Sequence, residues 1–113
     1  MSVIYHLARD SEWRAADRNG RYDGTVDDRR DGFLHFSTTE QVAESAARHR
    51  RGEAGILLVA VDADRLGDAL RWEPSRGGAL FPHLYGALPL DAVRWTAPLP
   101  LGADGLHRFP SLD

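Results

Sequence analysis

The stretch Gly55-Ile56-Leu57-Leu58-Val59-Ala60-Val61 is a continuous apolar run near the middle of the chain. It is too short for a long helix, and its branched side chains are typical of a β-strand. Alternate side chains of a strand point to opposite faces of a sheet, and both sets are apolar here. We therefore predict a central strand that is covered on both faces and that organises the rest of the fold.

The segments on either side of this run predict an α+β fold with a twisted, split β-sheet and two or three short helices. On the N-terminal side we expect, in order, a strand over residues 1–7, a helix starting at Asp10 or Ser11, an exposed polar loop over residues 21–31, a strand over residues 33–37, and a helix that begins within residues 37–41 and closes at Gly52. On the C-terminal side we expect a helical turn over residues 64–69, followed by strands and turns.

Length and composition predict one domain over residues 1–113. The net charge is -3, which argues against nucleic acid as a partner. All 14 basic residues are arginines, and the absence of lysine and cysteine excludes Schiff-base chemistry, a P-loop lysine, thiolate nucleophiles and disulfides. The N-terminus lacks a signal-peptide pattern, and no apolar stretch approaches about 18 residues. We expect a cytoplasmic protein without membrane contact.

Three histidines, His6, His35 and His83, lie on apolar stretches with strand character. Imidazole has an unperturbed pKa near neutrality, so burying three rings is costly unless each has a hydrogen-bond partner, a metal or a ligand. Phe33 and Ser37 share a strand face with His35. If these strands are neighbours, the rings meet in one polar and aromatic cleft.

These residues also have plainer explanations. Each histidine can bond to a backbone carbonyl of the core, and Glu73 is either a general base or a solvated strand-edge residue. The chain has no His-x-His, no His-Glu-x-x-His and no histidine pair at i, i+4, so we predict no metal site. A Ser-His-Asp triad built on Ser37 lacks a Gly-x-Ser-x-Gly elbow. His49 and His107 are expected to be surface or tail residues.

Two strings, Gly32-Phe33-Leu34-His35-Phe36-Ser37 and Phe81-Pro82-His83-Leu84-Tyr85-Gly86, occur in this order after Tyr5-His6, Trp13 and Gly20-x-Tyr22. With Glu73, these residues resemble the bacterial family called domain of unknown function 952 (DUF952), from the first strand to about Val93. The resemblance implies a fold similar to that of ADP-ribosyltransferases. Similarity of fold alone does not assign the reaction.

The resemblance also implies how NAD would be held as a substrate. His6 on the first strand would bind the ribose, and an aromatic ring would stack on a ring of the ligand. Glu73 would orient the ribosyl group and stabilise an oxocarbenium-like state. The predicted catalytic residues are Glu73 and His35, and the predicted ligand-binding residues are His6, Phe33, Ser37, His83 and Tyr85.

The leading functional hypothesis is a small protein with a His-lined cleft that binds NAD or another nucleotide and transfers an ADP-ribosyl group. One alternative is a non-catalytic module that recognises a nucleotide or a peptide through the same cleft. A metal-dependent hydrolase is the other alternative. All three hypotheses require the histidines to meet in one cavity.

Overall fold

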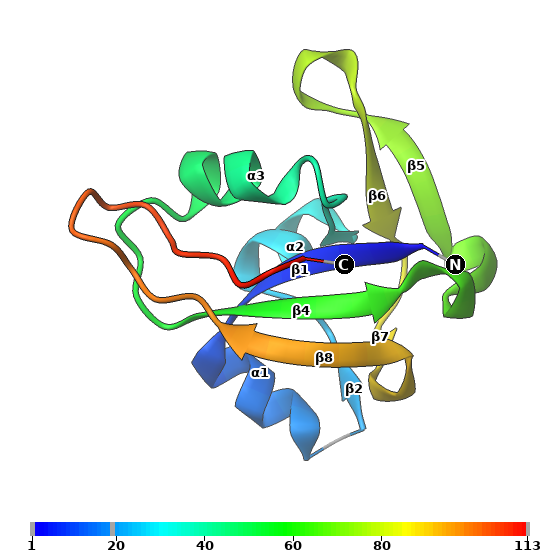
Figure 1. The fold of residues 1–113 in the computed structure, drawn as a ribbon. Coiled ribbons are helices and arrows are strands. Elements are labelled where there is room, and N and C mark those ends of the chain that lie inside the picture. Colours follow the sequence, from blue (N-terminus) through cyan, green and yellow to red (C-terminus); the bar gives the residue numbers. More distant parts are fainter. Residues whose placement is uncertain (1, 19, 113) are drawn as a thin grey trace.

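A three-stranded antiparallel sheet forms the centre of the molecule (Figure 1). In this computed structural model, which describes residues 2–18 and 20–112, strand β4 (Ile56–Asp62) lies between β1 (Val3–Arg9) and β8 (Val93–Pro98). The side chains of β4 are buried on both faces, including Leu58 and Val59. The prediction of a central, doubly covered strand is therefore confirmed.

Two hydrophobic clusters cover the two faces of this sheet. The cluster around Val59 includes Trp13 of helix α1 (Asp10–Asp17). The cluster around Leu58 includes Val42 of helix α3 (Val42–His49) and part of the C-terminal tail. Because burial of apolar area is the main favourable term in folding, β4 is the element on which both clusters depend.

A second antiparallel sheet carries three of the seven predicted site residues, His35, Glu73 and His83. Its order is β3 (Leu34–His35), β6 (Leu80–Leu84) and β5 (Leu70–Pro74), and Figure 1 shows the β5–β6 hairpin projecting from the central sheet. A bridge between Tyr5 of β1 and Ser37, with two backbone hydrogen bonds of 2.8 Å, links the sheets. Strands β2 (Arg21–Tyr22) and β7 (Leu88–Pro89) form a further antiparallel pair. The fold is α+β with antiparallel sheets and few helices, as predicted.

The segment over residues 21–31 is not the exposed loop that we predicted. It contains β2 and helix α2 (Val26–Asp31). A capping box starts this helix: the Asp28 N–H donates to Thr25 Oγ1 over 3.2 Å, and the Thr25 N–H donates to Asp28 Oδ2 over 2.8 Å. Gly32, with a φ of 88°, ends the helix in the left-handed conformation. The polar composition reflects the solvent-facing side of a short helix.

The other elements lie close to their predicted positions, and Met1, the first residue of the predicted N-terminal strand, lies outside the described residues. Helix α3 begins at Val42, after a turn in which the Thr38 N–H donates to Gln41 Oε1 over 3.0 Å. The short 3-10 helices are η1 (Ala63–Arg65), η2 (Gly67–Ala69), η3 (Arg76–Gly78) and η4 (Leu90–Ala92). The first two of these form the helical turn expected over residues 64–69.

A hydrogen bond joins the C-terminal tail to the loop that precedes β4. His107 is buried, and its Nε2 donates to the backbone carbonyl of Glu53 over 2.7 Å. The expectation that His107 is an ordinary tail residue is therefore wrong, because its ring ties two distant segments together. His49 is exposed, as expected, but it lines the cleft described below.

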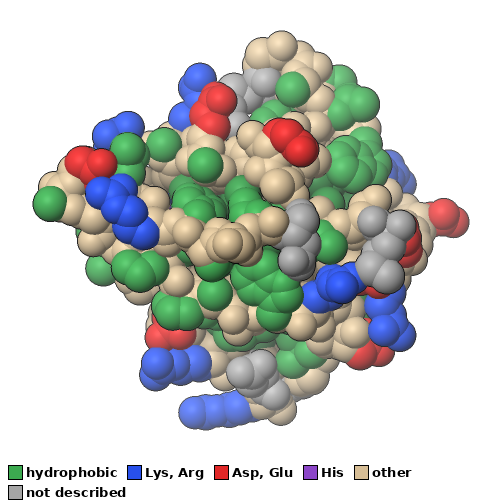
Figure 2. Space-filling view, in the orientation of Figure 1, with side chains coloured by type: hydrophobic (Ala, Val, Ile, Leu, Met, Phe, Trp, Pro, Cys, Tyr) green, Lys and Arg blue, Asp and Glu red, His purple; other side chains and the backbone are tan. Residues whose placement is uncertain are grey.

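The surface combines charges of both signs. In the face shown in Figure 2, arginines and acidic side chains gather toward the rim, and hydrophobic side chains show between them nearer the centre. Among the described residues, no helix is long and apolar enough to cross a membrane.

The role of β4 predicts a large stability difference between two Leu→Ala substitutions. Leu58→Ala removes a fully buried side chain and should lower the free energy of unfolding by about 2–5 kcal/mol. Leu80→Ala, at a position that is 52% exposed, should change it by less than about 0.5 kcal/mol. Urea unfolding followed by circular dichroism measures both, and equal losses would contradict the assignment of β4 as the central element.

Candidate functional site

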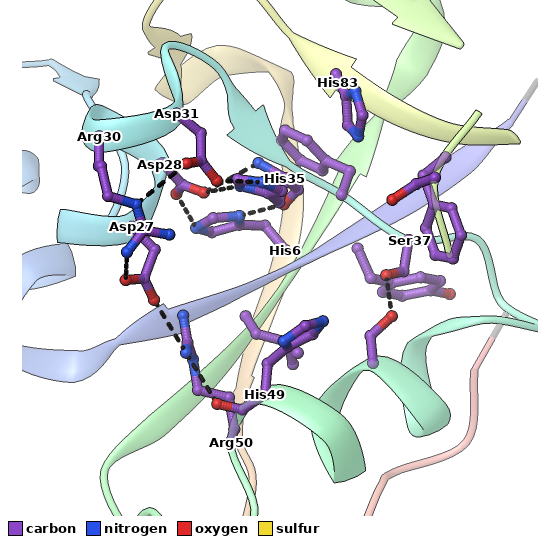
Figure 3. A pocket seen from close by; sticks show the side chains of 16 residues that line it. His6, Asp27, Asp28, Arg30, Asp31, His35, Ser37, His49, Arg50 and His83 are labelled. Atoms are coloured by element: carbon purple, nitrogen blue, oxygen red, sulfur yellow. Dashed lines mark hydrogen bonds and ion pairs between the residues drawn. The ribbon is translucent and has the colours of Figure 1, made fainter. Parts of the chain in front are cut away.

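A cleft of about 180 Å³ lies beside β1, between α2 and α3 (Figure 3). Its lining includes four histidines, three aspartates, two arginines and several hydroxyl groups: His6, His35, His49, His83, Asp27, Asp28, Asp31, Arg30, Arg50, Tyr5, Ser37, Ser45 and Ser75. Leu7, Phe36 and Phe81 complete it. The cleft therefore joins ionisable groups from both sheets to a partly apolar floor, as ligand-binding sites commonly do.

The buried carboxylate of Asp28 is the most heavily bonded group of the cleft. It accepts the backbone N–H of Thr25 over 2.8 Å and that of His35 over 3.1 Å, and its Oδ1 lies 2.5 Å from Nδ1 of the His35 ring. Burial alone would raise the pKa of Asp28. The hydrogen bonds from His35 and Thr25, together with the nearby His6 ring, outweigh that effect and lower the pKa to about 2. Asp28 therefore carries a fixed negative charge beneath the cleft.

The ring of His6 is buried directly beside this carboxylate. Its Nδ1 lies 2.7 Å from the backbone oxygen of His35, so Nδ1 donates this hydrogen bond. Nε2 then accepts from the hydroxyl of Tyr22 over 2.8 Å and lies 3.6 Å from Asp28 Oδ2. Burial lowers the pKa of His6 and raises that of Tyr22. His6 is consequently a neutral ring that fixes the backbone of β3.

His35 carries the network from the buried carboxylate to the cleft. Its side chain is 43% exposed, and Nε2 lies 3.1 Å from Asp31 Oδ2, opposite the Nδ1 contact with Asp28. Helix α2 supplies both carboxylates, three residues apart. An imidazole held between two carboxylates is fixed in orientation and is suited to exchanging a proton with a ligand.

His83 forms a second imidazole–carboxylate pair next to the first. His35 and His83 are opposite each other in the β3–β6 register, and their ring centroids are 5.7 Å apart. Glu73 Oε1 lies 2.7 Å from His83 Nδ1 and accepts the Tyr85 hydroxyl over 2.8 Å. The hydrogen bond with His83 is the main cause that lowers the pKa of Glu73. Phe33 stacks on the His83 ring with centroids 4.1 Å apart.

The predicted site residues lie in one region, in which four of them line the cleft and three lie next to it. His6, His35, His83 and Ser37 line the cleft, whereas Phe33, which was expected on the same strand face as His35 and Ser37, does not. Phe33 and Glu73 contact His83, and Tyr85 contacts both Phe33 and Glu73; the three form the adjoining rim. Ser37 has its Oγ 2.8 Å from that of Ser45 on α3. The roles given to these residues toward a ligand stay predictions.

Sequence reasoning missed Asp28, Asp31 and Arg50. A signal for the first was present in Thr25-Val26-Asp27-Asp28, in which a threonine precedes an acidic residue by three positions, as in a capping box. Among the described residues, no group of three or more His, Asp and Glu side chains is arranged to hold a metal ion.

A family model described as "Protein of unknown function (DUF952)" matches residues 7–96. The chain belongs to the DUF952 family. This DUF952 chain is similar to protein CC0527 from Caulobacter crescentus, with 47% sequence identity. The crystal structure of CC0527 superposes with a TM-score of 0.91, and the match covers 95% of this chain and 94% of that one. The solution NMR structure of CC0527 is 48% identical, with a TM-score of 0.82 over 94% and 91%. The comparison with curated proteins gives no match.

The hydrogen bonds of His6 predict its tautomer and its titration. The ring should be neutral and protonated at Nδ1, with a titration midpoint below 6.5, because burial disfavours the imidazolium. Long-range proton–nitrogen NMR correlations distinguish the two ring nitrogens through a pH series. A ring that is protonated at Nε2, or doubly protonated at pH 6.5, would contradict this assignment.

Asp28→Asn should destabilise the protein at neutral pH but not in strong acid. The native pKa of about 2 lies below the ordinary 3.8, so the ionised form contributes about 2 kcal/mol of stability above pH 3.8, and this contribution is lost as the pH falls through about 2. Urea unfolding between pH 7 and about 2 measures the difference from the native chain. Asp91→Asn, at an exposed position, is the matched control, and a loss that is independent of pH would refute the electrostatic explanation.

Proposed function

We propose that the cleft binds a nucleotide and that the protein transfers the ADP-ribosyl group of NAD. The observation that carries the proposal is the pair of adjacent imidazoles, His35 and His83, each in contact with a carboxylate. Imidazoles of this kind bind ribose hydroxyls and phosphate oxygens and exchange protons with them. The two rings lie on paired strands, so their separation is held by the backbone of the second sheet.

The aromatic rim supports a ligand that contains a flat ring. Phe33 lies against His83 and Tyr85, and Tyr85 is 37% exposed. The guanidinium of Arg71 lies 4.9 Å from the centroid of the Tyr85 ring, which holds that ring in place. A nicotinamide or a nucleobase would extend this stack, since aromatic rings favour offset contact with one another. A purely aliphatic ligand would gain nothing from it.

The fold that the DUF952 resemblance implies, similar to that of ADP-ribosyltransferases, is the reason for choosing NAD as the nucleotide. In this reaction the bond between nicotinamide and the ribose C1′ breaks, nicotinamide leaves, and a hydroxyl of the acceptor, or water where no other acceptor is present, bonds to C1′ and gives up its proton. His35 takes this proton at Nε2, which lies 3.1 Å from Asp31 Oδ2 on the exposed side of the ring and has to leave that carboxylate first. Glu73, which is 35% exposed, stabilises the positive charge that develops on the ribose.

His6 has a supporting task in this proposal. Its side chain is 2% exposed, and both ring nitrogens bond within the protein, to the backbone of His35 and to Tyr22. A ligand would have to displace one of these partners before it could reach the ring. His6 therefore positions His35, and direct contact between His6 and the ribose stays a prediction from the resemblance.

Two measurements test the proposal together. Ligand-detected NMR with millimolar NAD should show binding, and chromatography should show release of nicotinamide. Glu73→Gln should retain binding and lower the release at least about a hundredfold, because it removes a charge that stabilises the transition state. Glu44→Gln, on the exposed face of α3, is the matched control and should leave both measurements unchanged.

Absence of any NMR response to NAD would refute the proposal. Binding of NAD without release of nicotinamide would refute the transfer reaction and favour the non-catalytic nucleotide-binding module.

A further inference from the structure

We propose that Nε2 of His83 accepts a hydrogen bond from a ribose hydroxyl of the nucleotide, and that this contact places the ribose beside Glu73. The contact rests on the proposed function, since it requires a nucleotide in the cleft. It goes beyond that function by naming the protein atom that recognises the ribose and the ligand group that this atom selects.

The ring nitrogens of His6, His35 and His83 differ in what they contact. Both nitrogens of His6 bond to protein groups, and both nitrogens of His35 contact carboxylates. Nδ1 of His83 contacts Glu73, but among the described residues its Nε2 has no hydrogen-bond partner. Of these three rings, His83 is therefore the one that a ligand can bind without displacing a protein group.

The free nitrogen of His83 is open to the cleft. The side chain is 8% exposed, and it lines the cleft (Figure 3). In the described part of the chain, the unpartnered side-chain atoms that are sealed from solvent are the Tyr5 hydroxyl, Glu12 Oε1, Arg50 Nε and His107 Nδ1. Nε2 of His83 is not one of them. Buried polar groups are usually satisfied, so a largely buried ring with one accessible, unused nitrogen indicates a ligand.

Two contacts fix the direction of the His83 ring. Nδ1 lies 2.7 Å from Glu73 Oε1, and the Tyr85 hydroxyl donates to the same oxygen over 2.8 Å. Phe33 stacks on the ring with centroids 4.1 Å apart and an angle of 28° between the planes. A ring that is held at one nitrogen and on one face loses little conformational entropy when its other nitrogen binds a ligand.

The partner of Nδ1 decides which ligand group Nε2 can bind. Hydrogen bonds from His83 and Tyr85 hold the pKa of Glu73 below its ordinary value, so Glu73 is ionised at neutral pH and only accepts hydrogen bonds. Nδ1 therefore carries the proton of the neutral ring, and Nε2 presents a lone pair. A lone pair accepts from a hydroxyl and repels a phosphate oxygen. The ribose is thus the part of the nucleotide that this atom selects.

The aromatic rim brings the ribose to this atom. In the proposed complex the flat ring of the ligand extends the stack of Phe33 and Tyr85, and the ribose is bonded directly to that ring. Because Phe33 stacks on His83, a ribose next to the rim lies beside His83 and its partner Glu73. The charge of Glu73 is then near the carbon at which the bond to nicotinamide breaks, as the proposed reaction requires.

A cycle of two ligands and two proteins tests the contact. NAD, and an analogue that lacks both hydroxyls of the nicotinamide ribose, are titrated into the native chain and into His83→Asn. The Asn amide nitrogen can take the place of Nδ1 and keep the bond to Glu73, but nothing takes the place of Nε2. The native chain should bind the analogue about fivefold or more weakly than NAD, as expected for loss of a hydrogen bond, and His83→Asn should bind both equally.

Two controls separate recognition of the ribose from a structural role. A structural role of His83 would weaken both ligands alike in His83→Asn and leave their ratio unchanged. Glu44→Gln, at an exposed position of α3, should keep the ratio of the native chain. Nitrogen-15 NMR of the native chain, which needs no variant, should show Nε2 of His83 without a proton at neutral pH and a shift of its signal on addition of NAD.

Failure of the contact and failure of the proposed function are distinguishable. The contact is overturned, while NAD binding stands, if the native chain binds NAD and its analogue equally, if His83→Asn keeps their difference, or if Nε2 carries a proton at neutral pH. Adenosine monophosphate and its dideoxy form are titrated in the same way. If their difference depends on His83 while NAD does not bind, the contact is supported and NAD is refuted as the nucleotide. No response to any of these ligands overturns both.

Discussion

The buried negative charge of Asp28 is the constraint on which the cleft depends. A carboxylate at 3% exposure is tolerated because it receives hydrogen bonds from the backbone of Thr25 and His35 and contacts two imidazoles. The same bonds start helix α2 and join it to β3, so the local fold and the electrostatics of the cleft have one origin. Without this carboxylate, the ring of His35 and the backbone N–H of Thr25 would both lose a partner.

The two histidines next to Asp28, His6 and His35, differ in how deeply they are buried. His6 is bonded on both nitrogens inside the protein and supports the backbone, whereas the ring of His35 is half-exposed and faces the cleft. His83 repeats the second arrangement with Glu73. Two imidazoles with carboxylate partners on paired strands are suited to proton transfer to a bound ligand.

Sequence patterns predict the central strand and the strand faces of the cleft, but they do not predict Asp28 and helix α2. The apolar run over residues 55–61 predicts β4, and strand periodicity predicts that His6, His35 and Ser37 meet. Helix α2 escapes prediction because it is six residues long and polar on its exposed side, so its composition is that of a loop. The spacing of Thr25 and Asp28 permits a capping box, but the local sequence does not show that Asp28 is buried while Asp31 is exposed, or that Arg50 is less exposed than Arg48, because burial is decided by tertiary packing.

A carbon-13 NMR titration of the Asp28 carboxyl group tests the central claim most directly. If the carboxylate is held by the bonds described above, its signal should remain that of the ionised form down to strong acid, with a midpoint near pH 2. A midpoint near the ordinary 3.8 would show that the network does not hold the charge and would contradict this explanation of the cleft.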